Sequence, residues 1–194
     1  YIGEAGWPSH GWPAGLFDIC MVEKPRAAFH RAMWNDEPIV RIAVRDNALD
    51  IDHGRDLWQW PNMAAIWNFP RAYEGLVIEV NTTTNCERVA LFHNGNEMGV
   101  RRTADYPNHT ITWCLPYRRG TLVAKGINGT DTVAVHEIRT AGDAVRLKAT
   151  ADRGKLMADG QDLSYVQVEL LDKDGTLVQH ADRHVKASIE GEGR

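Results

Sequence analysis

The stretch Arg88-Val89-Ala90-Leu91-Phe92-His93-Asn94-Gly95-Asn96 decides the predicted fold. Its first five residues are largely apolar and favour a strand, and the Asn-Gly pair that follows is a strong signal for a two-residue hairpin. The turn that joins such strands has positive φ at both central residues, which Asn and Gly adopt more readily than other residues. We therefore predict a β-hairpin with its turn at Asn94-Gly95.

Similar short strands surround this hairpin in the sequence. Turn signals separate them at Arg119-Gly120 and at Asn128-Gly129. Short strands with turns at this spacing are typical of a β-sandwich. The expected strands are residues 76–80, 88–92, 110–115, 121–125 and 132–138. We predict a mainly β fold, with a β-sandwich accessory domain over residues 41–141.

The strand rhythm starts again after residue 141. Residues 145–149 and 165–171 alternate with period two, Asp174-Gly175 is a turn signal, and residues 184–189 form a third expected strand. An immunoglobulin-like sandwich needs about seven strands. We therefore expect residues 142–194 to be an incomplete Ig-like β-sandwich domain.

Residues 1–40 differ in texture from the rest of the chain. They are rich in Gly, Pro and Trp and contain one helical stretch, residues 23–34. Pro25 suits a first-turn position, and Phe29, Ala32 and Met33 follow the i, i+3, i+4 spacing of an apolar helix face. We predict a helix that ends before Asn35-Asp36.

Composition excludes several classes of protein. The chain is 43% apolar and 25% charged, with a net charge of −4 and no basic run, so we expect no nucleic-acid partner. No stretch approaches the roughly 18 apolar residues of a membrane span. Cys20, Cys86 and Cys114 lack metal-ligand spacing, so we expect buried thiols, with a Cys86–Cys114 disulfide as the alternative. We expect no metal and no cofactor; the acidic cluster of Asp50, Asp52, His53 and Asp56 matches no ligand signature.

Motifs in a fixed order along the chain carry a family resemblance. They are Tyr1-Ile2-Gly3-Glu4, Trp7-Pro8, Gly15-Leu16-Phe17-Asp18, Lys24-Pro25, Trp58-Gln59-Trp60-Pro61, residues 89–99, Pro116-Tyr117, residues 120–124 and residues 147–189. The series resembles the C-terminal region of glycoside hydrolase family 2, the β-galactosidase family. The resemblance implies Ig-like β-sandwich modules preceded by the last loop and helix of a catalytic (β/α)8 barrel, with the barrel end at residues 1–40. Because the chain opens without Met, we expect it to be a fragment of a longer enzyme, called here the parent enzyme.

The chemistry that the resemblance implies is retaining hydrolysis of β-galactosides by two carboxyl groups. In the family both glutamates lie on barrel strands upstream of the region that this chain resembles, so we assign no catalytic residue. The expected partners are a carbohydrate substrate, reached through the parent enzyme, and the rest of the catalytic barrel. The expected location is extracytoplasmic, in a bacterium.

Three residues are candidates for substrate binding: Glu4, Trp7 and Trp12. They would lie in a loop at the catalytic face of the barrel, where loops build active sites; the alternatives are loop packing for the tryptophans and a structural salt bridge for Glu4. Trp58, Trp60 and Trp67 form either a sugar-stacking platform or a core and interface cluster.

A rival hypothesis is that the chain is a stand-alone carbohydrate-binding or adhesion module. The Tyr1–Trp34 segment discriminates between the two hypotheses, because a binding module has no use for the loop and helix that end a barrel.

Overall fold

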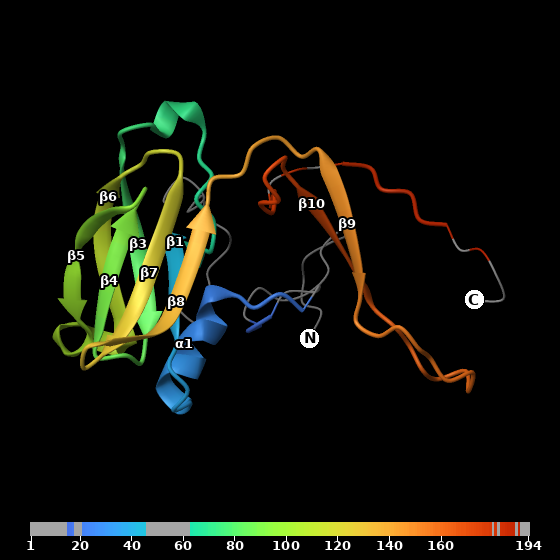
Figure 1. The fold of residues 1–194 in the computed structure, drawn as a ribbon, viewed down its shortest axis with the longest axis horizontal. Coiled ribbons are helices and arrows are strands. Elements are labelled where there is room, and N and C mark those ends of the chain that lie inside the picture. Colours follow the sequence, from blue (N-terminus) through green and yellow to red (C-terminus); the bar gives the residue numbers. More distant parts are fainter. Residues whose placement is uncertain are drawn as a thin grey trace, which may run out of the picture. The chain divides into compact units, whose positions relative to one another are not determined.

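The computed structural model describes residues 15–17, 21–45, 63–179, 181, 183–188 and 190 (Figure 1). Contacts between Cα atoms divide the chain into two compact units, residues 1–140 and 141–194. The described elements of unit 1 are α1 (Pro25–Trp34), β1 (Val40–Arg45), β2 (Met63–Ala64), β3 (Val77–Thr84), β4 (Arg88–His93), β5 (Asn96–Arg102), β6 (Thr110–Pro116), β7 (Thr121–Asn128) and β8 (Asp131–Arg139), with short 3₁₀ turns η1 (Arg71–Tyr73), η2 (Thr103–Asp105) and η3 (Pro107–His109).

Unit 1 is a sandwich of two antiparallel sheets (Figure 1). One sheet has the strand order β2-β1-β3-β6 and the other has the order β5-β4-β7-β8. Their inner faces share one apolar core, which includes Val80 and Trp113 from the first sheet and Leu91 and Leu122 from the second. The predicted mainly β fold is therefore confirmed, whereas the immunoglobulin-like label stays a prediction.

An aromatic cluster fills part of this core. Trp67 is fully buried, and its ring meets Phe69, His93 and Tyr117 at centroid distances of 5.9, 5.6 and 5.0 Å. The indole N–H donates to the carbonyl of Arg118 at 2.9 Å, so the one polar atom of the side chain is satisfied. Trp67 is thus a core residue and not part of an exposed sugar platform.

The predicted hairpin is present. β4 and β5 pair in antiparallel register around the turn, where φ is 50° at Asn94 and 81° at Gly95. Asn94 also fixes the neighbouring strand, because its Oδ1 accepts the Thr121 N–H at 2.8 Å. The turn therefore connects β5, β4 and β7 into one rigid end of the sheet.

Substitution of Gly95 by Val is expected to lower the free energy of unfolding by about 1 kcal/mol or more, because a β-branched residue at positive φ is strongly disfavoured. A Cβ atom at Gly95 would meet nothing within 4 Å, so backbone strain alone would produce the loss. Gly95→Asn is the matched control, because Asn tolerates positive φ. Equal urea midpoints for the wild type and the Val variant would contradict the expected strain.

The helix α1 agrees with the predicted segment, but of the predicted apolar face only Ala32 is fully buried. The buried residues are Ala27, Ala28 and Ala32, and this face packs against β1 and β3. Met33 and Trp34, in contrast, are 45% and 76% exposed. Small side chains let the helix approach the sandwich closely, and the large side chains then remain on the outside.

A histidine joins the two sheets at their edge. The short strand β2 pairs only with Val44 and Arg45 of β1. The N–H of Ile42, also on β1, donates instead to Nδ1 of His136 on β8 at 3.0 Å. Only a neutral imidazole can accept this hydrogen bond. Burial, with a smaller contribution from the positive charge of Arg41, lowers the pKa of His136 to about 4.

The stability of unit 1 is expected to depend on pH through His136. In the unfolded chain the pKa returns to 6.5, so this contribution is present above pH 6.5 and is lost as the pH falls from 6.5 through about 4. The total loss is at most about 3 kcal/mol. Urea unfolding across this pH window should show a shallower slope for His136→Gln than for the wild type. Identical slopes would show that His136 is not held neutral.

Unit 2 contains an antiparallel pair of strands, β9 (Arg146–Ala151) and β10 (Val166–Leu171). Neither strand pairs with a third among the described residues. Leu147, Val166 and Val168 are about half exposed. Of the strand predicted at 184–189, the described residues 184–188 form no strand. A two-stranded ribbon is marginal in water, so unit 2 depends on the other contacts of its chain.

Two of the three cysteines can be placed. Cys86 is buried and Cys114 is exposed, and both are free thiols. The alternative of a Cys86–Cys114 disulfide is therefore wrong, and the expectation of burial holds for Cys86 but not for Cys114. In the described part of the chain, no helix is both long and apolar enough to cross a membrane.

Candidate functional site

The predicted substrate-binding residues Glu4, Trp7 and Trp12 lie outside the described residues, so their role stays a prediction. The same holds for Cys20, for Trp58 and Trp60, and for the acidic cluster at 50–56. Of the residues singled out for sugar stacking, only Trp67 is described, and it belongs to the core.

A hollow lies at one end of the sandwich in unit 1. The β3–β4 turn and the first residue of β4 form one side, and the last residue of β5 with the η2–η3 connection forms the other. Its volume is about 720 Å³, within the range of small-molecule sites. The lining residues are Asn85, Cys86, Glu87, Arg88, Arg102, Thr103, Ala104, Tyr106, Asn108 and His109.

The hollow carries an excess of positive charge. Arg88 and Arg102 are directly opposite each other in the β4–β5 register, and like charges in such positions repel. Arg88 donates to the carbonyl of Gly129, while the Arg102 guanidinium has neither a hydrogen bond nor an ion pair with any described residue. Glu87 is the one lining carboxylate, and its Oε2 accepts the Gly129 N–H at 2.9 Å. Two arginines against one glutamate leave one net positive charge in a chain whose net charge is −4.

Two neutral polar groups complete the hollow. Arg101 donates to the Tyr106 hydroxyl at 3.0 Å, so the proton of that hydroxyl remains available for donation. His109 Nδ1 lies 3.2 Å from the carbonyl oxygen of Thr84. Because a carbonyl oxygen only accepts, Nδ1 is the donor in this contact, and Nε2 remains for a ligand. The hollow thus offers both a donor and an acceptor besides its cations.

The backbone at this site is unusual. Asn108 and His109 are consecutive residues without glycine, and both have positive φ, 58° and 53°. Such conformations cost on the order of 1 kcal/mol or more each and tend to cluster at functional sites. The strain brings both residues to the wall of the hollow.

The chemistry of the hollow suits binding rather than turnover. Retaining hydrolysis needs a pair of carboxyl groups, and only one carboxylate lines the hollow. Across the described residues, no group of three or more His, Cys, Asp or Glu side chains is arranged to hold a metal ion. We found this hollow from the structure alone; the sequence prediction missed it.

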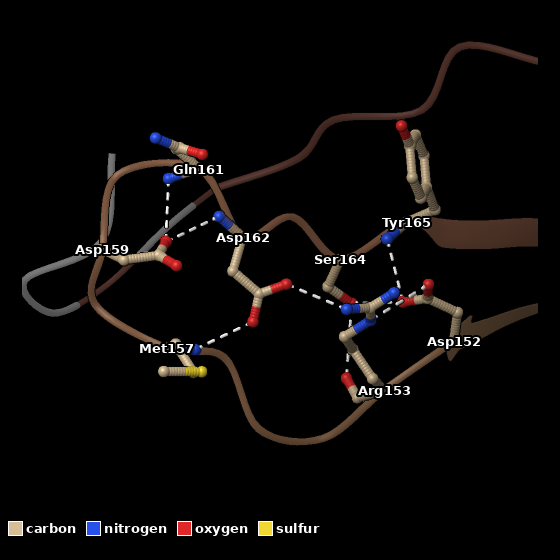
Figure 2. A network of polar contacts seen from close by, with 8 residues as sticks. All are labelled: Asp152, Arg153, Met157, Asp159, Gln161, Asp162, Ser164 and Tyr165. Atoms are coloured by element: carbon tan, nitrogen blue, oxygen red, sulfur yellow. Dashed lines mark hydrogen bonds and ion pairs between the residues drawn. The ribbon is translucent and has the colours of Figure 1, made fainter.

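A second polar cluster holds the loop between β9 and β10 in unit 2 (Figure 2). Asp152 Oδ1 accepts from the Ser164 hydroxyl at 2.7 Å and from the Tyr165 N–H at 3.0 Å. Asp162 accepts from the Met157 N–H at 2.9 Å and from Arg153 at 2.8 Å. Figure 2 shows these carboxylates turned toward donors of their own loop.

These loop carboxylates are structural anchors. The Ser164 hydrogen bond is the largest of the causes that lower the pKa of Asp152. The N–H groups of Gln161 and Asp162 lower the pKa of Asp159. The carboxylate oxygens of Asp152, Asp159 and Asp162 already accept hydrogen bonds from donors of their own loop, so the cluster fixes the conformation of the loop.

Asp172 plays the same part in the next turn. Its carboxylate accepts the Gly142, Asp174 and Thr176 N–H groups at 2.8, 2.9 and 2.8 Å. The first of these, together with the others, lowers the pKa of Asp172. Gly175, with φ of 84°, completes a hairpin turn, as the Asp-Gly signal predicts.

Asn96-Glu97, the one Asn-Glu dipeptide in the sequence, begins β5 directly after the hairpin turn, and both residues are exposed. Glu97 therefore lies on the surface of the sheet formed by β5, β4, β7 and β8.

Comparison with known proteins follows the two units. Residues 147–194 match the model of glycoside hydrolase family 2 C-terminal domain 5, and residues 75–134 match a domain of unknown function, DUF4982. A β-galactosidase of Bacteroides ovatus is 30% identical over the whole chain and 20% of its own length. A putative β-glucuronidase of Formosa agariphila is 28% identical over 99% of the chain and 17% of its length.

A solved structure agrees with these matches. A glycosyl hydrolase family 2 member from Bacteroides cellulosilyticus superimposes with a TM-score of 0.78 and 33% identity, over 86% of this chain and 22% of that one. In sequence and in fold, the chain is similar to the C-terminal region of these family 2 glycoside hydrolases. It spans about a fifth of the length of the relatives that it matches.

Proposed function

We propose that this chain is the C-terminal accessory portion of a retaining β-galactosidase-like parent enzyme that acts on terminal β-galactosides. The observation that carries the proposal is the alignment of the whole chain with a fifth of a β-galactosidase. In this proposal the carbohydrate substrate binds to the catalytic barrel of the parent enzyme, and this chain supports the barrel from its C-terminal side. An extracytoplasmic location in a bacterium is part of the same proposal.

Within this proposal, residues 1–40 are the end of the barrel, 41–141 a sandwich domain and 142–194 a second, incomplete one. The exposed Met33 and Trp34 support the first part, because large apolar side chains on the outer face of α1 suit contact with a further protein surface. The buried alanine face of α1 then holds the sandwich at a fixed position against that surface.

The proposal is tested with the complete open reading frame that contains this sequence. Its product should hydrolyse nitrophenyl β-galactoside, and two glutamates on barrel strands upstream of Tyr1 should be essential for turnover. A panel with the β-glucuronide and β-glucoside serves as the comparison. Preference for the glucuronide would refute the galactoside specificity, and inactivity on all three would refute the glycosidase function.

Hydrogen exchange tests the position of α1. In the isolated chain, we expect the amides of residues 26–34 to exchange faster than those of residues 88–92. The reason is that α1 buries only alanines, whereas β4 lies between two strands in the core. Equal protection in a dilute monomer would make α1 an integral part of the sandwich and would remove the support for a barrel end.

A further inference from the structure

The Arg88–Arg102 pair is the starting point of a further inference. These guanidinium groups belong to directly paired residues at the mouth of the hollow, and Arg102 has no partner among the described residues. Glu87 is adjacent in sequence to Arg88, but its Oε2 is bound to the Gly129 N–H. The repulsion between the two cations is therefore not offset by a described carboxylate that faces Arg102. An anion placed between them would relieve it, and Arg favours planar anionic groups that accept two hydrogen bonds.

The neutral groups in the hollow select for more than an anion. The Tyr106 hydroxyl can donate, His109 has its Nε2 left for a ligand, and both residues line the hollow together with the strained Asn108. A ligand with several hydroxyl groups on a compact framework can pair with both Tyr106 and His109. A volume of about 720 Å³ is ample for one or two sugar rings.

We propose that this hollow is a binding site for a saccharide unit with a single negative charge, carried as a carboxylate or a sulfate ester. The anionic group lies between Arg88 and Arg102, and the ring hydroxyls meet Tyr106, Asn108 and His109. The choice of a saccharide rests on the proposed function, whereas the negative charge follows from the arginine pair alone. The site lies within residues 75–134, so it would give a binding role to a domain whose function is undefined.

The site is tested by NMR titration of the isotope-labelled 194-residue chain. The probes are sodium glucuronate, glucose 6-sulfate, neutral methyl β-glucoside, acetate and inorganic sulfate. We expect at least one of the two charged sugars to shift the amides of Arg102, Asn108 and His109 and to bind about tenfold or more tightly than the neutral glucoside and than either simple anion. The charged sugar that binds better identifies the anionic group.

Arg102→Gln should weaken the binding of the charged sugar about tenfold, because the Arg102 guanidinium pairs with no described residue and is therefore available to the anion. The matched control is Arg71→Gln, which removes the same charge from the exposed turn η1, outside the hollow. The control variant should bind as the wild type does. Tyr106→Phe, which removes only a hydroxyl group, should weaken the charged sugar but leave acetate unchanged.

Three results would overturn the proposal. Equal binding of the charged and neutral sugars would remove the role of the arginines, and equal binding of acetate and glucuronate would remove the saccharide. Equal weakening by Arg102→Gln and Arg71→Gln would show a general effect of charge. Binding is measured without turnover, so failure here is distinguishable from failure of the parent enzyme to hydrolyse galactosides.

Discussion

The purified 194-residue chain is expected to leave nitrophenyl β-galactoside unhydrolysed. Retaining hydrolysis needs one carboxyl group as acid and a second, about 5 Å away, as nucleophile. Four of the described carboxylates have other positions or roles: Glu87 lines a cationic hollow, Glu97 lies on an exposed hairpin, and Asp152 and Asp172 anchor turns. Without the pair, the rate should be lower than that of the complete enzyme by a factor on the order of 10⁶ or more.

The measurement compares nitrophenol release by the isolated chain with release by the complete parent enzyme at equal concentration. Trace activity from a contaminating host enzyme is identified with Glu97→Gln, which should leave any residual rate unchanged. Turnover by the chain that disappears in this variant, or in a variant of another of its own carboxylates, would refute the assignment of an accessory role.

Replacement of Trp67 by Ala is expected to lower the free energy of unfolding of unit 1 by about 3–5 kcal/mol, the range for large aromatic core residues. Trp67 is fully buried and touches three other aromatic rings, so its removal leaves a cavity that these rings cannot fill. The indole hydrogen bond to Arg118 is lost as well. Urea unfolding followed by circular dichroism measures the loss.

Trp34→Ala is the matched control for this prediction, because Trp34 is 76% exposed and the chemical change is the same. Its effect should be within about 0.5 kcal/mol, as for other surface substitutions. Trp67→Phe should fall between the two, since it keeps an aromatic ring but loses the indole N–H. Similar losses for Trp34→Ala and Trp67→Ala would mean that Trp67 is not a centre of the core.

Much of the sandwich could be predicted from local sequence. The Asn94-Gly95 turn has positive φ at both residues, as expected, because few other residue pairs adopt this turn easily. The helix was predicted over 23–34 and is formed over 25–34, where Pro25 occupies the first turn. The strands 110–115 and 121–125 agree with β6 and β7 because alternating apolar residues fit a sheet with one buried face.

Tertiary contacts decided what local sequence could not. The apolar face of α1 was expected at Phe29, Ala32 and Met33, yet of these only Ala32 is fully buried, and Ala27 and Ala28 complete the buried face. The prediction of a strand at 184–189 was wrong for a different reason. An alternating pattern forms a strand only where a partner strand is available, and residues 184–188 have none in the described chain.

The hollow could not be predicted because its residues are distant in sequence. Arg88 and Arg102 become neighbours only through the β4–β5 register, which shifts at an irregularity between Leu91 and Phe92. The positive φ of His109 has no signal in its residue type. A search for like charges at mirrored positions around the Asn94-Gly95 turn would have paired Arg88 with Arg101 instead, because the irregularity moves the register by one residue.

The unpaired edges of β9 and β10 have a consequence for handling the protein. Apart from the end of β10, where Leu171 bridges Leu177 and the Leu170 carbonyl accepts the Val178 N–H, each strand presents one row of backbone N–H and C=O groups without a partner in the described chain. Val166 and Val168 on β10 are about half exposed. Such edges can recruit strands from other molecules and start aggregation. Lys148 and Glu169 form an ion pair across the ribbon at 3.0 Å, and their charges oppose the stacking of further strands. Removal of either charge should therefore reduce solubility at high protein concentration before it alters the fold.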